Sequence, residues 1–80
     1  MELVNLFKRK IEDLRWFKLN FKSIQETYGG SYIAVEDLEI IEHDKNYSYL
    51  LEKLKNAGYD TSKVLIKKVP NKKEFLVYYG

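Results

Sequence analysis

One uninterrupted helical pattern constrains the fold of this chain more than any other feature of its sequence. An apolar side chain recurs every three or four residues over residues 2–28, with neither proline nor glycine among them. The apolar positions are Leu3, Phe7, Ile11, Leu14, Phe17, Phe21, Ile24 and Tyr28. This period predicts one amphipathic α-helix, and Gly29 and Gly30 supply the stop that commonly follows a helix.

A straight helix over residues 2–28 is too long for the domain to which it belongs. At about 1.5 Å per residue it would reach about 40 Å, whereas a compact chain of 80 residues has a radius of gyration of about 12 Å. The sequence leaves two alternatives. Either the helix breaks near Asn20, or its excess apolar face packs against a second copy of the chain, as a homodimer.

Two groups of side chains lie off this apolar stripe. Trp16 and Leu19 fall on the opposite side of the helix, and Lys8, Arg15, Lys18 and Lys22 line one flank. Trp16 fits either an interface anchor or a residue that packs beneath a later segment. The residues expected at a dimer or partner interface are Phe7, Leu14, Trp16, Phe17, Leu19 and Phe21.

The composition argues against an enzyme. The chain has no cysteine, which excludes a disulfide framework, a thiolate metal site and a cysteine nucleophile. Its single histidine, His43, stands between Glu42 and Asp44, and one imidazole among scattered carboxylates does not favour a metal or catalytic centre. No glycine-rich phosphate-binding motif occurs. We expect no catalytic residue, no metal and no cofactor.

Length and hydropathy predict a single domain, residues 1–80, with the long helix in residues 1–30 and a core in residues 31–80. The chain contains neither an apolar run of about 18 residues nor a recognisable signal peptide. We therefore expect a cytoplasmic protein, or one of the host cytoplasm if it is viral, with no membrane partner.

Charge is segregated along the chain, although the formal net charge is only +2. Residues 31–52 carry one lysine and six acidic residues, whereas residues 53–80 carry seven lysines and two acidic residues. A basic terminal third indicates a polyanion or an acidic surface as partner. The alternative is that these lysines keep a hairpin soluble and protect its edges from aggregation.

Residues 31–80 combine strand and helix patterns, so the fold class is α+β. Residues 31–35 favour a strand, residues 46–57 a helix, and residues 63–69 with 74–79 a β-hairpin. Residues 36–42 fit either a short acidic helix or a strand. With a helix there, the order is that of a long helix, two further helices and a C-terminal hairpin. With a strand, two helices lie on a three-stranded antiparallel sheet.

The first of these orders, and the end of the helix at residues 46–57, resemble the winged helix-turn-helix DNA-binding superfamily. Tyr47, Leu51 and Leu54 stand 11, 7 and 4 residues before Gly58, and Tyr59 follows it. The resemblance covers residues 31–79. Two features depart from the family pattern: the turn at residues 43–46 is shorter, and Asp60 stands where an aliphatic residue is usual.

The resemblance implies a regulator of transcription or replication. Its recognition helix, residues 46–57, would enter the major groove of double-stranded DNA, and a basic wing, residues 63–79, would contact phosphates or the minor groove. The nucleic-acid-binding residues implied in this way are Ser48, Tyr49, Lys53, Lys67, Lys68, Lys72 and Lys73.

A protein-interaction module is the alternative function, of the kind with which phages and viruses bind and inhibit a partner protein. A long strand over residues 31–42, giving a three-stranded sheet with two helices, favours this alternative. Trp16, Leu19 or an exposed tyrosine would then anchor the interface, and the lysines would lie only at its rim.

Overall fold

The computed structural model describes residues 2–72, with side chains from Asn5 onward. It is an α+β fold, as the sequence predicts. The elements follow in the order α1 (Glu2–Leu19), α2 (Phe21–Tyr28), β1 (Tyr32–Glu36), β2 (Glu39–Asp44), α3 (Tyr47–Asn56), the short 3-10 helix η1 (Thr61–Lys63) and β3 (Leu65–Lys68).

The three strands form one antiparallel sheet in the order β2-β1-β3. At the centre of β1, Ile33 lies opposite His43 of β2 on one side and Lys67 of β3 on the other. Ile33, Ala34 and Val35 are fully buried. A run of consecutive buried residues is typical of a strand whose sheet is covered on both faces, and β1 has that position.

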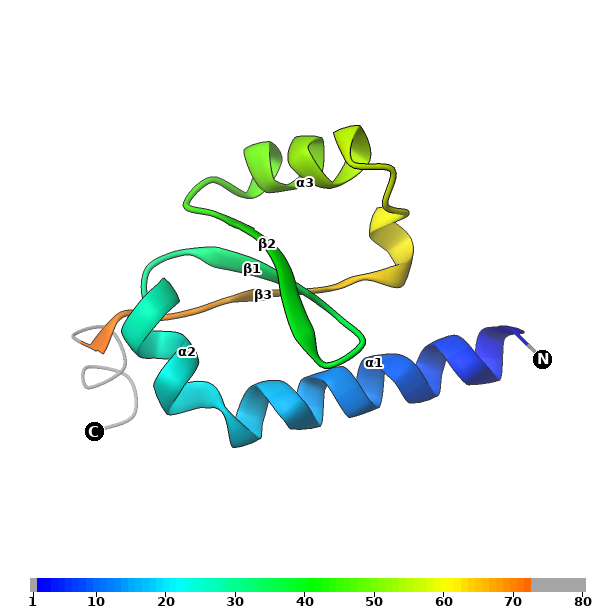
Figure 1. Cartoon of the computed structure of the whole chain (residues 1–80), viewed down its shortest axis with the longest axis horizontal. Coiled ribbons are helices and arrows are strands. Elements are labelled where there is room, and N and C mark those ends of the chain that lie inside the picture. Colours follow the sequence, from blue (N-terminus) through cyan, green and yellow to red (C-terminus); the bar gives the residue numbers. More distant parts are fainter. Residues whose placement is uncertain (1, 73–80) are drawn as a thin grey trace.

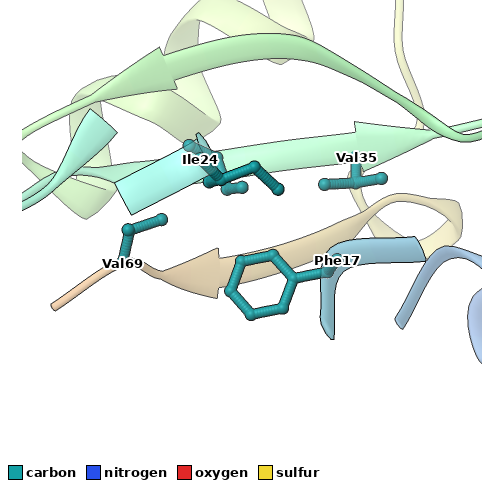
Figure 2. Close-up of a cluster of buried hydrophobic side chains, with 5 residues drawn as sticks. Phe17, Ile24, Val35 and Val69 are labelled. Atoms are coloured by element: carbon teal, nitrogen blue, oxygen red, sulfur yellow. The ribbon is translucent and has the colours of Figure 1, made fainter. Parts of the chain in front are cut away.

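Helices cover the two faces of the sheet, so the molecule has three layers (Figure 1). On one face, Phe17 of α1 and Ile24 of α2 form a core with Ile33, Val35 and Val69. Figure 2 shows the side chains of this cluster gathered together, with Phe17, Ile24, Val35 and Val69 labelled. On the other face, α3 contributes Leu50 and Leu54, which pack with Ala34 and Val64.

The long amphipathic helix expected over residues 2–28 is broken at Asn20, which confirms the first of the two alternatives. The carbonyl oxygen of Trp16 accepts hydrogen bonds from both the backbone N–H of Asn20, at 3.0 Å, and its side-chain Nδ2, at 2.9 Å. A side chain that competes for a helix carbonyl in this way bends or ends the helix. Because α2 leaves at an angle to α1 (Figure 1), Ile24 reaches the same core as Phe17.

Residues 36–42 form the end of β1, a turn and the start of β2. No helix lies between β1 and α3, both within the described part of the chain, so the helix-turn-helix is not formed there and the winged-helix assignment is not confirmed. Over residues 2–72 the structure instead has three α-helices around a three-stranded antiparallel sheet. A one-turn helix is marginal by itself, whereas a strand at this place gains hydrogen bonds from β1.

The first strand of the expected C-terminal hairpin corresponds to β3, which pairs with β1. Its expected partner at residues 74–79 lies outside the described residues, as does Lys73. None of the helices over residues 2–72 is both long and apolar enough to cross a membrane.

Candidate interaction surface

The solvent-facing side of α1 carries three exposed apolar side chains, of which Phe7 is 67%, Ile11 42% and Leu19 80% exposed. Three exposed cations lie among them on the same side. We call this surface the α1 outer face; its residues are Phe7, Lys8, Ile11, Arg15, Lys18 and Leu19. The first turns of α1 extend beyond the tip of the β1–β2 hairpin (Figure 1), so the sheet does not cover them.

The spacing of the apolar residues explains why part of the stripe is left outside. Each step of four residues advances about 40° beyond a full turn of the helix. The step from Phe7 to Ile11 therefore carries the apolar side chain around the helix, away from the side on which Phe17 is buried. The period of the stripe is helical throughout, but only its second half faces the sheet.

The residues expected at an interface separate into two groups. Phe17 is only 5% exposed and belongs to the core of the chain itself, while Leu14, Trp16 and Phe21 pack against that core. Packing is thus the alternative that the structure adopts for Trp16. Phe7 and Leu19 remain exposed. Sequence reasoning missed Ile11, because its position in the stripe is indistinguishable from that of a core residue, and treated the three cations only as a flank.

Of the three α3 residues expected to contact DNA, two are exposed and one forms ion pairs within the chain. Ser48 and Tyr49 are exposed. Lys53 lies instead against an acidic part of β2, with its Nζ 3.0 Å from Oδ2 of Asp44 and 3.9 Å from Oε1 of Glu42. Together with the backbone N–H of Asn46, Lys53 holds the pKa of Asp44 below its ordinary value.

Lys53 also forms a hydrogen bond with a backbone group on the outer edge of β2. Its ammonium donates to the carbonyl oxygen of His43 at 3.1 Å, and the N–H of His43 donates to Oε1 of Glu42 at 3.0 Å. Both backbone groups of His43 are therefore bonded to side chains. Since β2 lies at the edge of the sheet, these bonds occupy groups that a further strand would need.

The lysines of β3 point to opposite faces of the sheet, as successive residues of a strand do. Nζ of Lys67 lies 5.8 Å from the centre of the Phe17 ring, on the side of α1. Nζ of Lys68 lies 4.9 Å from the centre of the Tyr32 ring, on the side of α3. Lys72 is exposed. The structure thus does not bring the expected DNA contacts of α3 and β3 together into one cluster.

A shallow polar groove of about 590 Å³ lies where α2, β2 and α3 meet. It contains His43, whose ring centre is 5.0 Å from that of Tyr28. Its lining residues are Thr27, Tyr28, Ser31, His43, Asp44, Lys45 and Lys53. Within the described residues, no group of three or more histidine, aspartate and glutamate side chains is arranged to hold a metal ion.

Residues 23–73 match the model of DUF5678, which is described as a family of unknown function. The match covers more than half of the chain, from α2 to beyond β3, so the α1 outer face lies outside the matched residues. No curated protein and no solved structure matches the chain.

Proposed function

We propose a function from the surfaces of the chain itself, because the chain belongs to the DUF5678 family and that family is of unknown function. The chain is a non-enzymatic protein-interaction module that acts by stoichiometric binding. Its docking surface is the α1 outer face. It would inhibit the partner protein by occupying a binding site on that protein.

The exposure of Phe7 and Leu19 carries this proposal. Both are large apolar side chains, and they are 67% and 80% exposed although the core beside them is already filled by Phe17 and Ile24. Burial of one such side chain is worth about 1.5–3 kcal/mol. Because Phe7 and Leu19 are mostly exposed, neither side chain contributes much burial free energy to the fold of the chain. Most of that free energy is therefore available for binding a partner.

The number of residues on this surface indicates a modest interface. The α1 outer face has six residues, whereas a standard stable interface uses about 20–30 residues on each side. A small interface with two or three apolar anchors is typical of a transient complex.

Affinity enrichment of the full chain from cells that produce it, followed by reconstitution, tests the proposal. A protein enriched in this way supports it only if the purified protein binds the chain in a fixed ratio and the double variant Phe7→Ser, Leu19→Ser loses that binding. Tyr49→Ser is the matched control, because Tyr49 is 61% exposed on α3. Binding that survives the double variant, or that the control also abolishes, would refute the assigned surface.

DNA binding is the second candidate. It is favoured by the lysines on and just after β3, which are Lys67, Lys68 and Lys72. The ion pairs of Lys53 argue against a recognition helix at α3, so this candidate rests on the β3 lysines alone. Fluorescence anisotropy with duplex DNA at two salt concentrations tests it. The triple variant with alanine at these three lysines should abolish binding, and absence of binding at about 50 mM salt removes the candidate.

A further inference from the structure

The charges on the α1 outer face give the chemistry of its partner. Lys8, Arg15 and Lys18 are interleaved with the apolar side chains, and none of the six residues is acidic. Glu12, the nearest acidic residue in sequence to Ile11, instead lines a small groove with Asp37 and Leu38 beside the hairpin tip. The surface therefore presents cations and apolar groups together.

Within residues 5–72, these three cations have no acidic partner. No ion pair joins Lys8, Arg15 or Lys18 to a carboxylate of residues 5–72, where the ion pairs are those of Lys53 with Glu42 and Asp44. A cation without an internal partner can pair with a carboxylate across an interface and forfeits no internal bond when it does so.

From this arrangement we infer that the partner is a protein segment with an apolar stripe or groove edged by aspartate and glutamate. This inference rests on the proposed function and names the partner class of the same surface. The partner's apolar groups would cover Phe7, Ile11 and Leu19, and its carboxylates would pair with the cations at the rim, where complementary charge gives specificity and faster association.

A second copy of the chain fits this surface less well. Two α1 outer faces in contact would bring three cations of one copy against three of the other, and like charges placed together disfavour association. The acidic part of β2 offers a second copy little, because Glu42 and Asp44 are already paired with Lys53.

An anionic membrane is a poorer match for a different reason. Helices that lie on a bilayer keep their apolar and charged residues on separate sides. On the α1 outer face both kinds lie on one side, as in Ile11 and Arg15, which are one turn apart, and in Ile11 and Lys18, which are two turns apart. Pockets and carboxylates on a protein surface can match this mixture residue by residue.

Two synthetic peptides and a vesicle test the inference on the full chain. The first peptide is an amphipathic helix of about 20 residues with leucine on one side and glutamate along its edges, long enough to form a helix in water. The second has lysine in place of glutamate. The vesicles contain phosphatidylcholine with about a quarter of phosphatidylglycerol. Backbone amide signals of the labelled chain are followed by NMR.

The glutamate peptide should shift the signals of residues 7–19, and the double variant Arg15→Glu, Lys18→Glu should weaken its binding roughly tenfold or more. Lys45→Glu is the control, since Lys45 is an exposed lysine outside this surface. Equal binding of the lysine peptide, equal binding by the charge-reversed variant, or binding to the vesicles without binding to the glutamate peptide would each overturn the inference. So would oligomers of the chain that charge reversal removes.

The same variants separate this inference from the proposed function. If a reconstituted partner loses affinity with Phe7→Ser, Leu19→Ser but not with Arg15→Glu, Lys18→Glu, the protein-binding function stands and the acidic partner is wrong. If affinity survives the serine variant, the docking surface assigned under the proposed function is wrong. All four residues are exposed, so thermal unfolding should show that every variant is folded.

Discussion

The backbone N–H of Leu38 donates a hydrogen bond of 2.9 Å to Oδ1 of Asp13, which is 25 residues earlier in the chain. Asp13 is only 5% exposed, so α1 places a buried carboxylate against the tip of the β1–β2 hairpin. The turn residues Asp37 and Leu38 have φ angles of 51° and 62°, in the left-handed region that favours glycine. Asp13 therefore stabilises a turn in which Leu38 disfavours the backbone conformation, whereas an aspartate such as Asp37 tolerates it.

Removal of the Asp13 carboxylate should destabilise the protein. Asp13→Ala leaves the N–H of Leu38 without its acceptor, and a hydrogen bond to a charged group is worth about 1.5–3 kcal/mol. The free energy of unfolding, measured in urea, should fall by about that amount. Glu12→Ala changes an exposed neighbour and should alter it by less than about 0.5 kcal/mol. Equal losses for the two variants would contradict the anchoring role.

Leu38→Gly should stabilise the protein. The left-handed conformation costs an L-residue about 1–2 kcal/mol, and the added freedom of glycine in the unfolded chain offsets about 0.4–1 kcal/mol of the relief. Leu38 is 49% exposed, so the loss of its half-buried side chain offsets a further part of the gain. We expect a gain of up to about 1 kcal/mol in the free energy of unfolding. Leu38→Val should have the opposite effect, and a gain from valine would argue against strain at this turn.

Gly58→Ala should destabilise the protein. Gly58 has a φ of 88°, and a Cβ added there would meet no atom within 4 Å, so the cost arises from the backbone alone. We expect a loss of about 1–2 kcal/mol, measured by urea unfolding. Gly58→Asn should lose less, because asparagine tolerates this conformation better than alanine does. If alanine and asparagine have equal effects, the loss has another origin.

Two phenylalanines of α1 should respond very differently to the same substitution. Phe17 is 5% and Phe7 67% exposed. Phe17→Ala should lower the free energy of unfolding by about 3–5 kcal/mol, whereas Phe7→Ala should change it by no more than about 0.5 kcal/mol. Chemical denaturation of both variants checks this. A large loss for Phe7→Ala would mean that its side chain stabilises the fold and is not free for a partner.

Stability should depend on pH through Asp44. Its pKa lies below the ordinary value of 3.8, because the N–H of Asn46 and the ammonium of Lys53 favour the charged form. A carboxylate of this kind stabilises the fold above its unfolded pKa, and the contribution is lost as the pH falls through the lower folded pKa. The destabilisation by Asp44→Asn should therefore be full near neutral pH and shrink below pH 3.8. Urea unfolding across this range measures it, and a difference independent of pH would contradict the assignment.

The pattern that resembles a recognition helix has a local physical explanation. The N–H of Tyr59 donates to the carbonyl oxygen of Leu54 at 2.9 Å, and that of Gly58 to Lys55 at 3.0 Å. These two bonds form the Schellman motif, which ends many helices with a glycine followed by an apolar residue. The sequence therefore predicts the end of α3 well, but the same pattern carries little information about DNA.

The candidate site was only partly predictable for reasons of geometry. The sequence singles out Phe7 and Leu19 as interface residues, and both are exposed. It also assigns Phe17 to the interface and leaves out Ile11, because a helical period shows which residues share a stripe and not which part of the stripe a sheet will cover. The ion pairs of Lys53 could not be predicted, because its acidic neighbours Asp44 and Glu42 are nine and eleven residues away in sequence and adjacent only in the fold.

Local pattern by itself determined the helical segments of residues 2–28, the helix α3 with its glycine stop, and the strand β3, because each depends on side-chain period and on the conformations of a few residues. Tertiary structure alone decided residues 36–42. Their short apolar run fits both the helical period and the strand period. Pairing of β2 with the buried strand β1 makes them part of a hairpin, and the hydrogen bond from the N–H of Leu38 to Asp13 holds that hairpin against α1. Contacts between distant residues also decided which half of the amphipathic stripe became core and which part, with Phe7 and Ile11, stayed exposed.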